Sequence, residues 1–312
     1  MNKKIAIQMD NINSIDYDYD SSFIIAYEAQ NRGYDIFYYN PEDLFIENNI
    51  VNASGHFIEL KKNKSNYFNF ISNNKIEDLS KFLFVFLRQD PPFNMNYITS
   101  TYILDCLPSS TKIINHPTAV RNATEKLFTF EFHEFMPPTI VTQDINKIYS
   151  FLKNEKDIIT KPLYGNGGEG IHRFNIRDFN KEILESYLHL PIMVQRYIPE
   201  ISDGDRRIIF FDGDYVGSVA RIPKDGNLKA NFHAGGQAKK TGLVYRDSEI
   251  VSKVGPKLKE KNLFFVGIDV IGNYLTEINV TSPTGIKQIN ILNNVNLEKI
   301  FWDKLEAKYN LG

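Results

Sequence analysis

The 312-residue sequence has one cysteine, one tryptophan and no long hydrophobic run. A single thiol cannot form an internal disulfide, which favours a reducing compartment. Cys106 lies in the apolar stretch Tyr102–Leu107, so we expect a small buried side chain there rather than a catalytic thiol. Runs such as Phe82–Leu87 are too short to cross a bilayer, and the first residues lack a signal-peptide core. These absences predict a cytoplasmic protein.

The sequence also lacks an excess of charge of either sign. Lys and Arg total 36 and Asp and Glu total 38, which gives a formal net charge of −2. Such a balance provides no long-range attraction to nucleic acid or to an anionic membrane. The densest basic run, at 61–64, lies among Asn and Ser, as in a solvated loop. We therefore expect neither nucleic acid nor a membrane as a partner.

The first part of the chain has the order of a parallel α/β domain. A strand pattern at Lys4–Met9 is followed by a helical pattern at Ser21–Arg32 and a second strand at Tyr34–Tyr39. Phe82–Leu87 is continuously apolar, which is typical of a strand buried on both faces. Ligands of open α/β sheets bind beyond the carboxyl ends of the strands, so the polar loop Arg88–Phe93 is a site candidate.

The rest of the chain alternates helices with antiparallel strands, as in α+β domains. Asp212-Gly213-Asp214 separates two strands and predicts a hairpin, whereas polar Pro223–Gly242 predicts a mobile loop. The predicted domains are 1–122, 123–200 and 201–312. The expected strands are Thr139–Val141, Asp157–Lys161, Gly170–Phe174, Pro191–Tyr197, Arg206–Phe211, Tyr215–Ile222, Leu263–Ile271 and Tyr274–Val280, and the expected helices are Glu125–Phe132, Ile145–Leu152, Phe179–Leu188, Ser248–Lys261 and Asn296–Lys308.

The stretch Gly165–Gly170 has the spacing G-x-G-x-x-G. A dinucleotide-binding turn requires a helix after the glycines, and a Walker A loop requires Lys-Ser/Thr, but Ile171–Phe174 has a strand pattern. A glycine-rich turn between two strands instead forms a flap whose backbone N–H groups close over nucleotide phosphates, and Lys161 could reach one of them. The alternative is a tight surface hairpin with a solvated lysine.

Three polar residues lie among apolar neighbours near the C-terminus. Glu277 and Asn279 are two residues apart in one strand and share a face, while Asp269 lies on the preceding strand. Mg²⁺ bound through carboxylates, an amide oxygen and nucleotide phosphates would account for them. The alternative is a carboxylate satisfied by a neighbouring arginine or backbone N–H. The metal hypothesis requires an odd-length turn or a bulge, because otherwise Asp269 and Glu277 face opposite sides of the sheet.

In this order along the chain, these features resemble the ATP-grasp ligases, and more specifically the bacterial glutathione synthetase family over nearly all 312 residues. The segments that carry the resemblance are DSSF (Asp20–Phe23), EAQNRGY (Glu28–Tyr34), DPPF (Asp90–Phe93), EKLFT (Glu125–Thr129), DGDRR (Asp203–Arg207), ARIP (Ala220–Pro223), HAGG (His233–Gly236), VGIDVIG (Val266–Gly272) and LTEINVTSPTGI (Leu275–Ile286).

The resemblance implies an α/β and α+β chain with an ATP-grasp fold: an N-terminal pre-ATP-grasp α/β domain, a central lid domain and a C-terminal domain. It implies ATP as co-substrate, with Mg²⁺ as the metal and Mn²⁺ as the alternative. ATP would phosphorylate the cysteinyl carboxylate of γ-glutamylcysteine, and glycine would attack the acyl phosphate. A homotetramer is also implied.

The resemblance also assigns roles to individual residues. Arg207 and Arg221 would bind the reacting carboxylate and its phosphate, although ion pairing at the surface is an alternative for both. Asp205 would lie near the ribose. ATP would be bound by Lys126, Lys161, Gly165, Asn166, Gly167, Gly168, Gln195, Arg196, Tyr197, Ile198 and Asp205, the metal by Asp269, Glu277 and Asn279, and the substrate by Ser21, Ser22, Arg88, Asn231, Gly235, Gly236, Ser282, Pro283 and Thr284.

The sequence departs from the family pattern at three positions. Gln89 replaces a Lys, Asn166 replaces a Met that is common in the flap, and Gly285 replaces a Cys that often follows Ser-Pro-Thr. None of the three is a group that the chemistry requires. Two other functions stay open: another ATP-grasp carboxylate–amine ligase, of the D-Ala–D-Ala or glutamate-adding kind, and an inactive nucleotide-binding protein. The substrate segments favour glutathione over the first, and the complete set of charged residues disfavours the second.

Overall fold

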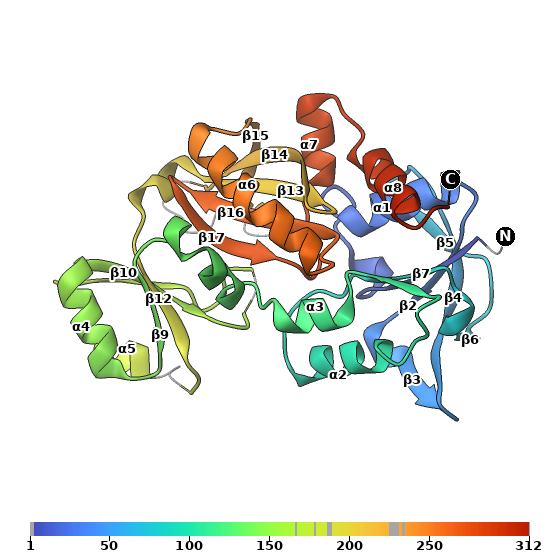
Figure 1. Cartoon of the computed structure of the whole chain (residues 1–312), viewed down its shortest axis with the longest axis horizontal. Helices are drawn as coiled ribbons and strands as arrows, with labels where there is room; N and C mark the ends of the chain where they lie inside the picture. Colours follow the sequence, from blue (N-terminus) through green and yellow to red (C-terminus); the bar gives the residue numbers. More distant parts are fainter. Residues whose placement is uncertain are drawn as a thin grey trace.

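The computed structural model describes residues 3–165, 167–177, 179–185, 189–224, 231–232 and 235–311. These residues form three β-sheets arranged along the long axis of the molecule (Figure 1). The sheet of the first 114 residues lies at the right in this view, the sheet that holds the glycine loop lies at the left, and the third sheet lies between them. The predicted Asn166 lies outside the described residues.

The first sheet has a parallel centre, in which β1 pairs with β2 and β7, and β7 pairs with β8. The predicted strand–helix–strand unit is confirmed, because α1 (Ser21–Asn31) connects β1 to β2. The strands, in spatial order, are β3 (Leu44–Glu47), β4 (Ile50–Leu60), β2 (Asp35–Tyr39), β1 (Lys4–Gln8), β7 (Phe84–Leu87) and β8 (Lys112–Ile114), with β5 (Phe68–Phe70) and β6 (Lys75–Asp78) paired to β4. Helices α2 (Met95–Leu104) and α3 (Pro117–Asn122) follow β7 and β8.

The second sheet is antiparallel and carries the glycine loop between two of its strands. β10 pairs with β11, so the predicted strand–loop–strand arrangement is confirmed and the dinucleotide-binding alternative is excluded. The strands, in spatial order, are β11 (His172–Asn175), β10 (Asp157–Pro162), β12 (Ile192–Arg196) and β9 (Thr139–Thr142). Helices α4 (Ile145–Glu155) and α5 (Lys181–Glu185) complete this unit, and the predicted helix at 179–188 is therefore shorter within the described residues.

The third sheet is antiparallel, with α6 (Tyr245–Glu260), α7 (Ile286–Asn293) and α8 (Leu297–Lys308) around it (Figure 1). The predicted loop at 223–242 is wrong for 237–240, which form β15. All four β15 side chains are exposed, so no apolar alternation marks the strand. Eight of the twenty residues of this predicted mobile loop, 225–230 and 233–234, lie outside the described part. The strands, in spatial order, are β15 (Gln237–Lys240), β14 (Asp214–Ile222), β13 (Asp205–Phe211), β16 (Phe265–Ile271) and β17 (Tyr274–Asn279).

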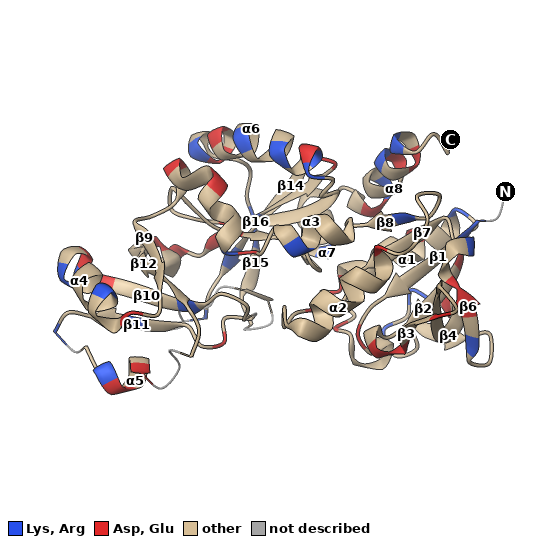
Figure 2. Ribbon diagram, turned by 60° about the horizontal axis from the view of Figure 1, so that its bottom comes forward, with Lys and Arg blue, Asp and Glu red and all other residues tan. Residues whose placement is uncertain are grey.

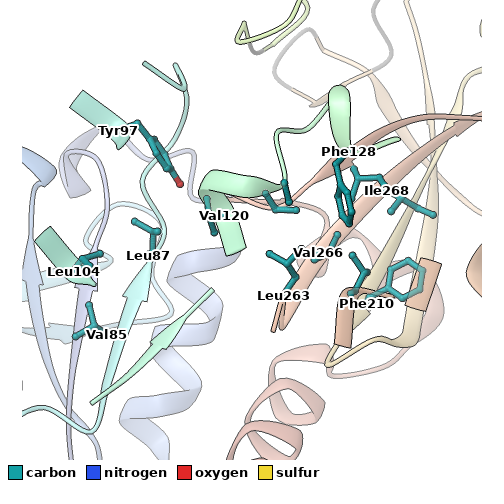
Figure 3. Packing of buried hydrophobic residues seen from close by; sticks show 14 of the residues in the cluster. Val85, Leu87, Tyr97, Leu104, Val120, Phe128, Phe210, Leu263, Val266 and Ile268 are labelled. Carbon is teal, nitrogen blue, oxygen red and sulfur yellow. The ribbon is translucent and has the colours of Figure 1, made fainter. Parts of the chain in front are cut away.

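One hydrophobic cluster joins the first sheet to the third. Figure 3 shows Val85 and Leu87 of the first sheet on one side, and Val266 and Ile268 of the third sheet on the other. Phe128, from the 3₁₀ helix η4 (Leu127–Phe135), packs into the same cluster. The predicted helix at 125–132 is thus a 3₁₀ helix that covers the third sheet.

The surface is polar and mixed in charge. Lys and Arg alternate with Asp and Glu on the outer helices α6 and α8 (Figure 2), in keeping with the small net charge. Cys106 is exposed at the end of α2, so the prediction of a buried thiol is wrong. The apolar pattern around Cys106 belongs to the buried side of α2, which includes Leu104, and the chain turns outward after it. None of the described helices is long and apolar enough to span a membrane.

Candidate functional site

A pocket of about 770 Å³ lies where the three sheets meet. Its volume is in the range of pockets that enclose a small-molecule ligand. The predicted site residues that line it are Lys126, Lys161, Gly165, Gly167, Gly168, Gln195, Arg196, Tyr197, Ile198, Asp205, Arg207, Arg221, Asn231, Asp269, Glu277, Asn279, Ser282, Pro283 and Thr284. Residues separated by more than 150 positions in the sequence therefore share one cavity.

The charged wall of this pocket is one face of the third sheet. Asp205 and Arg207 are two residues apart on β13, so their side chains point to the same side. Across the strands, Arg221 of β14 lies opposite Asp205, and Asp269 of β16 lies opposite Arg207. The sheet register thus places two arginines and two aspartates side by side.

Glu277 extends this wall onto β17. The turn between β16 and β17 has two residues, because Ile271 pairs with Tyr274, and this register alone would pair Asp269 with Thr276. A register shift next to Asp269 leaves Thr276 as an extra residue, so Asp269 pairs directly with Glu277. The bulge required by the metal hypothesis is therefore present, and both carboxylates face the pocket.

The arginines are paired with the aspartates. Arg207 Nε and Nη2 donate to Asp269 Oδ1 and Oδ2 at 2.5 and 2.9 Å. Arg221 Nη2 also lies 2.9 Å from Asp269 Oδ2. Burial alone would raise the pKa of Asp269, but the two guanidinium groups hold that pKa well below its ordinary value. Both arginines are buried, so the alternative of ion pairing at the surface is wrong, and the pairs lie in the interior.

Of the three predicted metal ligands, Asp269 has the carboxylate that is most engaged by protein groups. Asn279 Nδ2 donates to Asp269 Oδ2 at 3.2 Å, so three residues already bind the Asp269 carboxylate. Within the described part of the chain, the Glu277 carboxylate takes part in no hydrogen bond or ion pair, and no cluster of three or more His, Cys, Asp or Glu is arranged to hold a metal. One carboxylate and one amide oxygen suit Mg²⁺ when ligand phosphates supply further oxygens.

Two lysines lie below the glycine loop. Lys126 Nζ donates to the carbonyl oxygen of Gly165 at 3.0 Å, and both Lys126 and Lys161 are buried. Burial lowers the pKa of Lys161, and the carboxylate of Glu277 opposes that shift. Gly167 and Gly168 have positive φ angles of 60° and 78°, so their backbone adopts the conformation that glycine favours. Buried cations beneath a glycine loop are a suitable site for an anion.

The segment Gln195–Ile198 joins the second sheet to the third along the pocket wall. The Gln195 side chain is buried and donates to Thr139 Oγ1 at 3.1 Å. Arg196 Nη2 donates to the Tyr274 hydroxyl at 2.7 Å, which connects the two sheets. The side chains of Gln195 and Arg196 are thus engaged by neighbouring residues, and the whole segment lines the cavity.

The far end of the pocket is closed by loops of the first and third domains. Ser282 Oγ donates to Asp90 Oδ1, and Arg88 Nη2 donates to the carbonyl oxygen of Pro283 at 3.1 Å. Arg88 Nε also donates to Ser22 Oγ at 2.9 Å. The predicted Ser21, Ser22 and Arg88 do not line the pocket but are buried behind Pro283.

The glycines predicted to close a loop over the intermediate lie beside the pocket and not on its wall. Gly235 N–H donates to the carbonyl oxygen of Phe232 at 2.9 Å, and Gly236 N–H to that of Asn231 at 3.0 Å. These bonds make a tight turn, and Asn231 and Phe232 then face the cavity.

Four carboxyl groups on the pocket wall were not assigned a role of their own from the sequence: Asp10, Asp90, Glu125 and Glu169. Asp10 accepts the backbone N–H of Asp90 at 2.7 Å, which links the loops after β1 and β7. Glu125 accepts from Thr281 Oγ1 at 3.0 Å, and burial raises the pKa of Glu125 to about 7. Asp10 and Asp90 follow strands of a parallel sheet, a position that could have identified them.

Family models and full-length relatives point to the same family for the whole chain. The prokaryotic glutathione synthetase N-terminal domain matches residues 3–121, and the prokaryotic glutathione synthetase ATP-grasp domain matches residues 125–294. Glutathione synthetase of Mesorhizobium japonicum is 42% identical over 312 residues, which cover 99% of each chain. Glutathione synthetase of Buchnera aphidicola subsp. Schizaphis graminum is 40% identical over 313 residues, which cover 98% of each chain.

Solved structures show the same fold at low identity. D-cycloserine synthetase DcsG has a TM-score of 0.68 at 14% identity and covers 98% of this chain and 99% of its own. D-alanyl-alanine synthetase A of Vibrio cholerae has a TM-score of 0.61 at 12% identity and covers 100% of this chain and 99% of its own. The ATP-grasp ligase PsnB, with a TM-score of 0.65 at 15% identity and coverage of 98% and 99%, supports the predicted fold. The chain therefore has an ATP-grasp fold and belongs to the prokaryotic glutathione synthetase family.

Proposed function

We propose that this chain is a glutathione synthase, an ATP-dependent ligase that joins γ-glutamylcysteine to glycine and releases ADP and phosphate. The observation that carries the proposal is the face of the third sheet, where Arg207, Arg221 and Glu277 line one pocket with two lysines beneath a glycine loop. The full-length similarity to glutathione synthetases supports the choice of substrate.

In the first step, an oxygen of the cysteinyl carboxylate attacks the γ-phosphorus of ATP, and ADP leaves. Lys126 and Lys161 would hold phosphate oxygens from the side of the glycine loop, and the guanidinium groups of Arg207 and Arg221 line the same pocket. Little covalent chemistry by the protein is needed, because positioning and charge account for most catalysis of phosphoryl transfer. The exposed Cys106, far from the pocket lining, is not required.

Glu277 and Asn279 would hold Mg²⁺, with Asp269 close by. Bound there, the cation would neutralise phosphate charge and polarise the transferring group. The protein's own contribution is to keep Glu277 on the pocket face through the bulge at Thr276. Mn²⁺ would suit the same oxygen donors.

In the second step, the glycine amine attacks the acyl carbon, the amide bond forms, phosphate leaves and the amine loses a proton. Water must be excluded, because it would hydrolyse the acyl phosphate. Phe232 lies beside the Arg221 guanidinium, and the Thr284 carbonyl oxygen accepts from Arg207 Nη1 at 3.3 Å, so the segments 231–232 and 282–284 both line the pocket next to the arginines. These segments would also present hydroxyl and backbone groups to the peptide substrate.

The rival function is ligation of another amine, as in a D-Ala–D-Ala-like or glutamate-adding ligase. The ATP and metal residues serve the phosphoryl step common to all such enzymes, so they cannot exclude it. Purified protein with ATP and Mg²⁺ should release phosphate and form tripeptide with γ-glutamylcysteine plus glycine, but not with two molecules of D-alanine. Phosphate release with the D-alanine pair alone would refute the assignment to glutathione.

Two further properties belong to the same proposal. We propose domains at 1–122, 123–200 and 201–312, in line with one sheet in each range, and a homotetramer acting in the cytoplasm. Sedimentation velocity at micromolar concentration tests the assembly directly, since a monomer of 36.1 kDa and a tetramer are easily resolved.

A further inference from the structure

Phe232 brings an aromatic ring to the pocket wall beside the arginines, and no role was assigned to it from the sequence. The ring centroid lies 5.8 Å from the guanidinium carbon of Arg221. The side chain is 5% exposed, so protein groups surround most of the ring. Because Arg207 and Arg221 are the proposed ligands of the reacting carboxylate, atoms bonded to that carboxylate come within reach of the ring.

Protein groups behind Phe232 keep the ring in one place. Phe232 belongs to the buried cluster that also contains Val219 and Ile286. At Gly285, a Cβ would lie 4.0 Å from Phe232 Cε2 and 3.5 Å from Arg207 Cγ, so the ring edge and the arginine stem lie against the same stretch of backbone. Close packing of this kind leaves a large ring little room to move. The ring is therefore a fixed part of the wall.

Tyr19, on the loop before α1, supports Phe232 from the first domain. The two rings have centroids 5.2 Å apart and planes inclined by 35°. Lys287 and Gln288 of α7 donate to the carbonyl oxygens of the two residues that precede Tyr19, the second bond at 2.9 Å. The third domain thus fixes the backbone that carries Tyr19, and the aromatic pair adds to the packing. The support of Phe232 is built from two domains.

The position of the ring bears on the side chain of the substrate. In the proposed reaction, the carbon next to the reacting carboxyl group carries –CH₂–SH. This branch begins beside the group that the arginines bind, so the wall around the arginines also bounds the side chain. An apolar wall discriminates by length, since one methylene more or less typically changes kcat/KM by about 10- to 200-fold. A fixed ring would therefore admit a short side chain and exclude a longer one.

We propose that Phe232, supported by Tyr19, is the specificity-determining residue that limits the length of the side chain next to the reacting carboxylate. The inference deepens the proposed function and rests on it. A side chain of the size of –CH₂–SH fits against the ring, and one with an additional methylene collides with it. Truncating the ring would then relax the choice of dipeptide. Turnover of the shorter dipeptide continues, because the phosphoryl step depends on charge.

The test compares two dipeptides without a thiol that differ by one methylene, γ-glutamyl-α-aminobutyrate and γ-glutamylnorvaline. With ATP, Mg²⁺ and glycine, the wild type should prefer the shorter one by about 10- to 200-fold in kcat/KM. Phe232→Ala should reduce this preference to less than about threefold. Phe70→Ala, which removes a ring that is 46% exposed and does not line the pocket, is the control and should keep the wild-type preference. An unchanged preference in Phe232→Ala would overturn the inference.

Further variants separate selectivity from a loss of structure. The preference is a ratio measured within one protein, so a smaller folded fraction cancels out of it. Tyr19→Ala removes the support of the ring and should also lower the preference, whereas Tyr19→Phe keeps the ring and should retain it; equal preferences in these two variants would contradict the role of Tyr19.

If Phe232→Ala fails to fold, Phe232→Leu should lower the preference in the same direction. Loss of activity with both dipeptides in folded Phe232→Leu would show that the ring serves turnover itself and would overturn the inference. A wild type that forms no tripeptide from γ-glutamylcysteine and glycine refutes the proposed function. An active wild type that uses both test dipeptides equally well refutes only this inference.

Discussion

At the scale of single residues, the site is a set of buried charges that neutralise one another. Alternation in the sequence predicts that Glu277 and Asn279 share a face, and they do. The pairing of Asp269 with Arg207 could not be predicted in the same way, because it depends on the register between β13 and β16. The Asp269 carboxylate is bound by arginines, as in the alternative to the metal hypothesis. The Glu277 carboxylate remains available to a metal.

Glu277→Ala should abolish turnover and leave the fold intact. The reason is that the Glu277 carboxylate lies on the pocket wall beside Asn279 and is bound by no protein group within the described residues. We expect a loss of at least about 100-fold in kcat, the usual effect of removing a group that stabilises transition-state charge. Glu260→Ala, which removes an exposed carboxylate at the end of α6, is the matched control. Retained activity in Glu277→Ala would remove the metal hypothesis.

Glu125 should make stability depend on pH. Burial raises its pKa from 4.5 to about 7, with Glu277 adding to the shift and Lys126 opposing it. Because the folded state holds this proton more tightly, the stabilisation is fully present below about pH 4.5 and is lost as the pH rises through about 7. Relative to the wild type, Glu125→Gln should therefore gain stability between pH 5 and pH 8, by up to about 3 kcal/mol. Urea unfolding at both values measures this, and parallel pH profiles would contradict it.

At the scale of secondary-structure elements, the glycine loop shows which features the sequence predicts and which it does not. The strand pattern after Gly170 correctly predicted a turn between two strands of one sheet. The contact that holds the loop, from Lys126 to the Gly165 carbonyl, joins elements 39 residues apart and left no sign in the local sequence. Periodicity thus identifies an element, whereas its neighbours depend on the whole fold.

Gly170→Ala should weaken the binding of ATP. Gly170 has a φ of 67°, and a Cβ there would lie 2.7 Å from Pro162 Cγ. A left-handed conformation costs an alanine about 1–2 kcal/mol, so the KM for ATP should rise about 5- to 30-fold. Gly242→Ala is the control, because a Cβ at that position meets nothing within 4 Å. An unchanged KM in Gly170→Ala would mean that the loop does not need this conformation.

The elements missing from the prediction have a physical reason in common. β15 is exposed on all four side chains, and β4 carries Gly55, where a Cβ would lie 2.2 Å from the Tyr38 carbonyl oxygen. β15 forms through backbone pairing with β14 and not through an apolar face of its own. β4 does bury Val51, Ala53, Ile58 and Leu60, but Gly55 interrupts this apolar pattern in the sequence. The central strands β1 and β7 are buried, so their apolar composition alone was sufficient to predict them.

At the scale of the whole molecule, the C-terminal helix joins the first and third domains. The Trp302 indole N–H donates to the Ile25 carbonyl oxygen at 2.8 Å, and its ring stacks on Tyr34 with centroids 4.9 Å apart. Arg32 of the first domain pairs with Asp303 and Glu306 of α8. The last helix of the chain, α8, thus packs against the first helix, α1. The predicted division into consecutive domains did not indicate this contact between the two ends of the sequence.

Trp302→Ala should destabilise the protein as a whole. The side chain is fully buried, and truncating a buried aromatic side chain typically costs about 3–5 kcal/mol. Tyr245→Ala, at a side chain that is 82% exposed, should change stability by less than about 0.5 kcal/mol. Urea denaturation measures both. A loss below about 1 kcal/mol for Trp302→Ala would show that α8 does not hold the two domains together.

The central claim is that the chain activates the cysteinyl carboxylate with ATP and passes it to glycine. The most direct measurement uses γ-glutamylcysteine with ¹⁸O in that carboxylate, together with ATP, Mg²⁺ and glycine, and follows the products by mass spectrometry. One carboxylate oxygen stays in the new amide and the other leaves with phosphate, so the account predicts tripeptide and phosphate carrying a single ¹⁸O in equal amounts. Unlabelled phosphate, or phosphate without tripeptide, would contradict it.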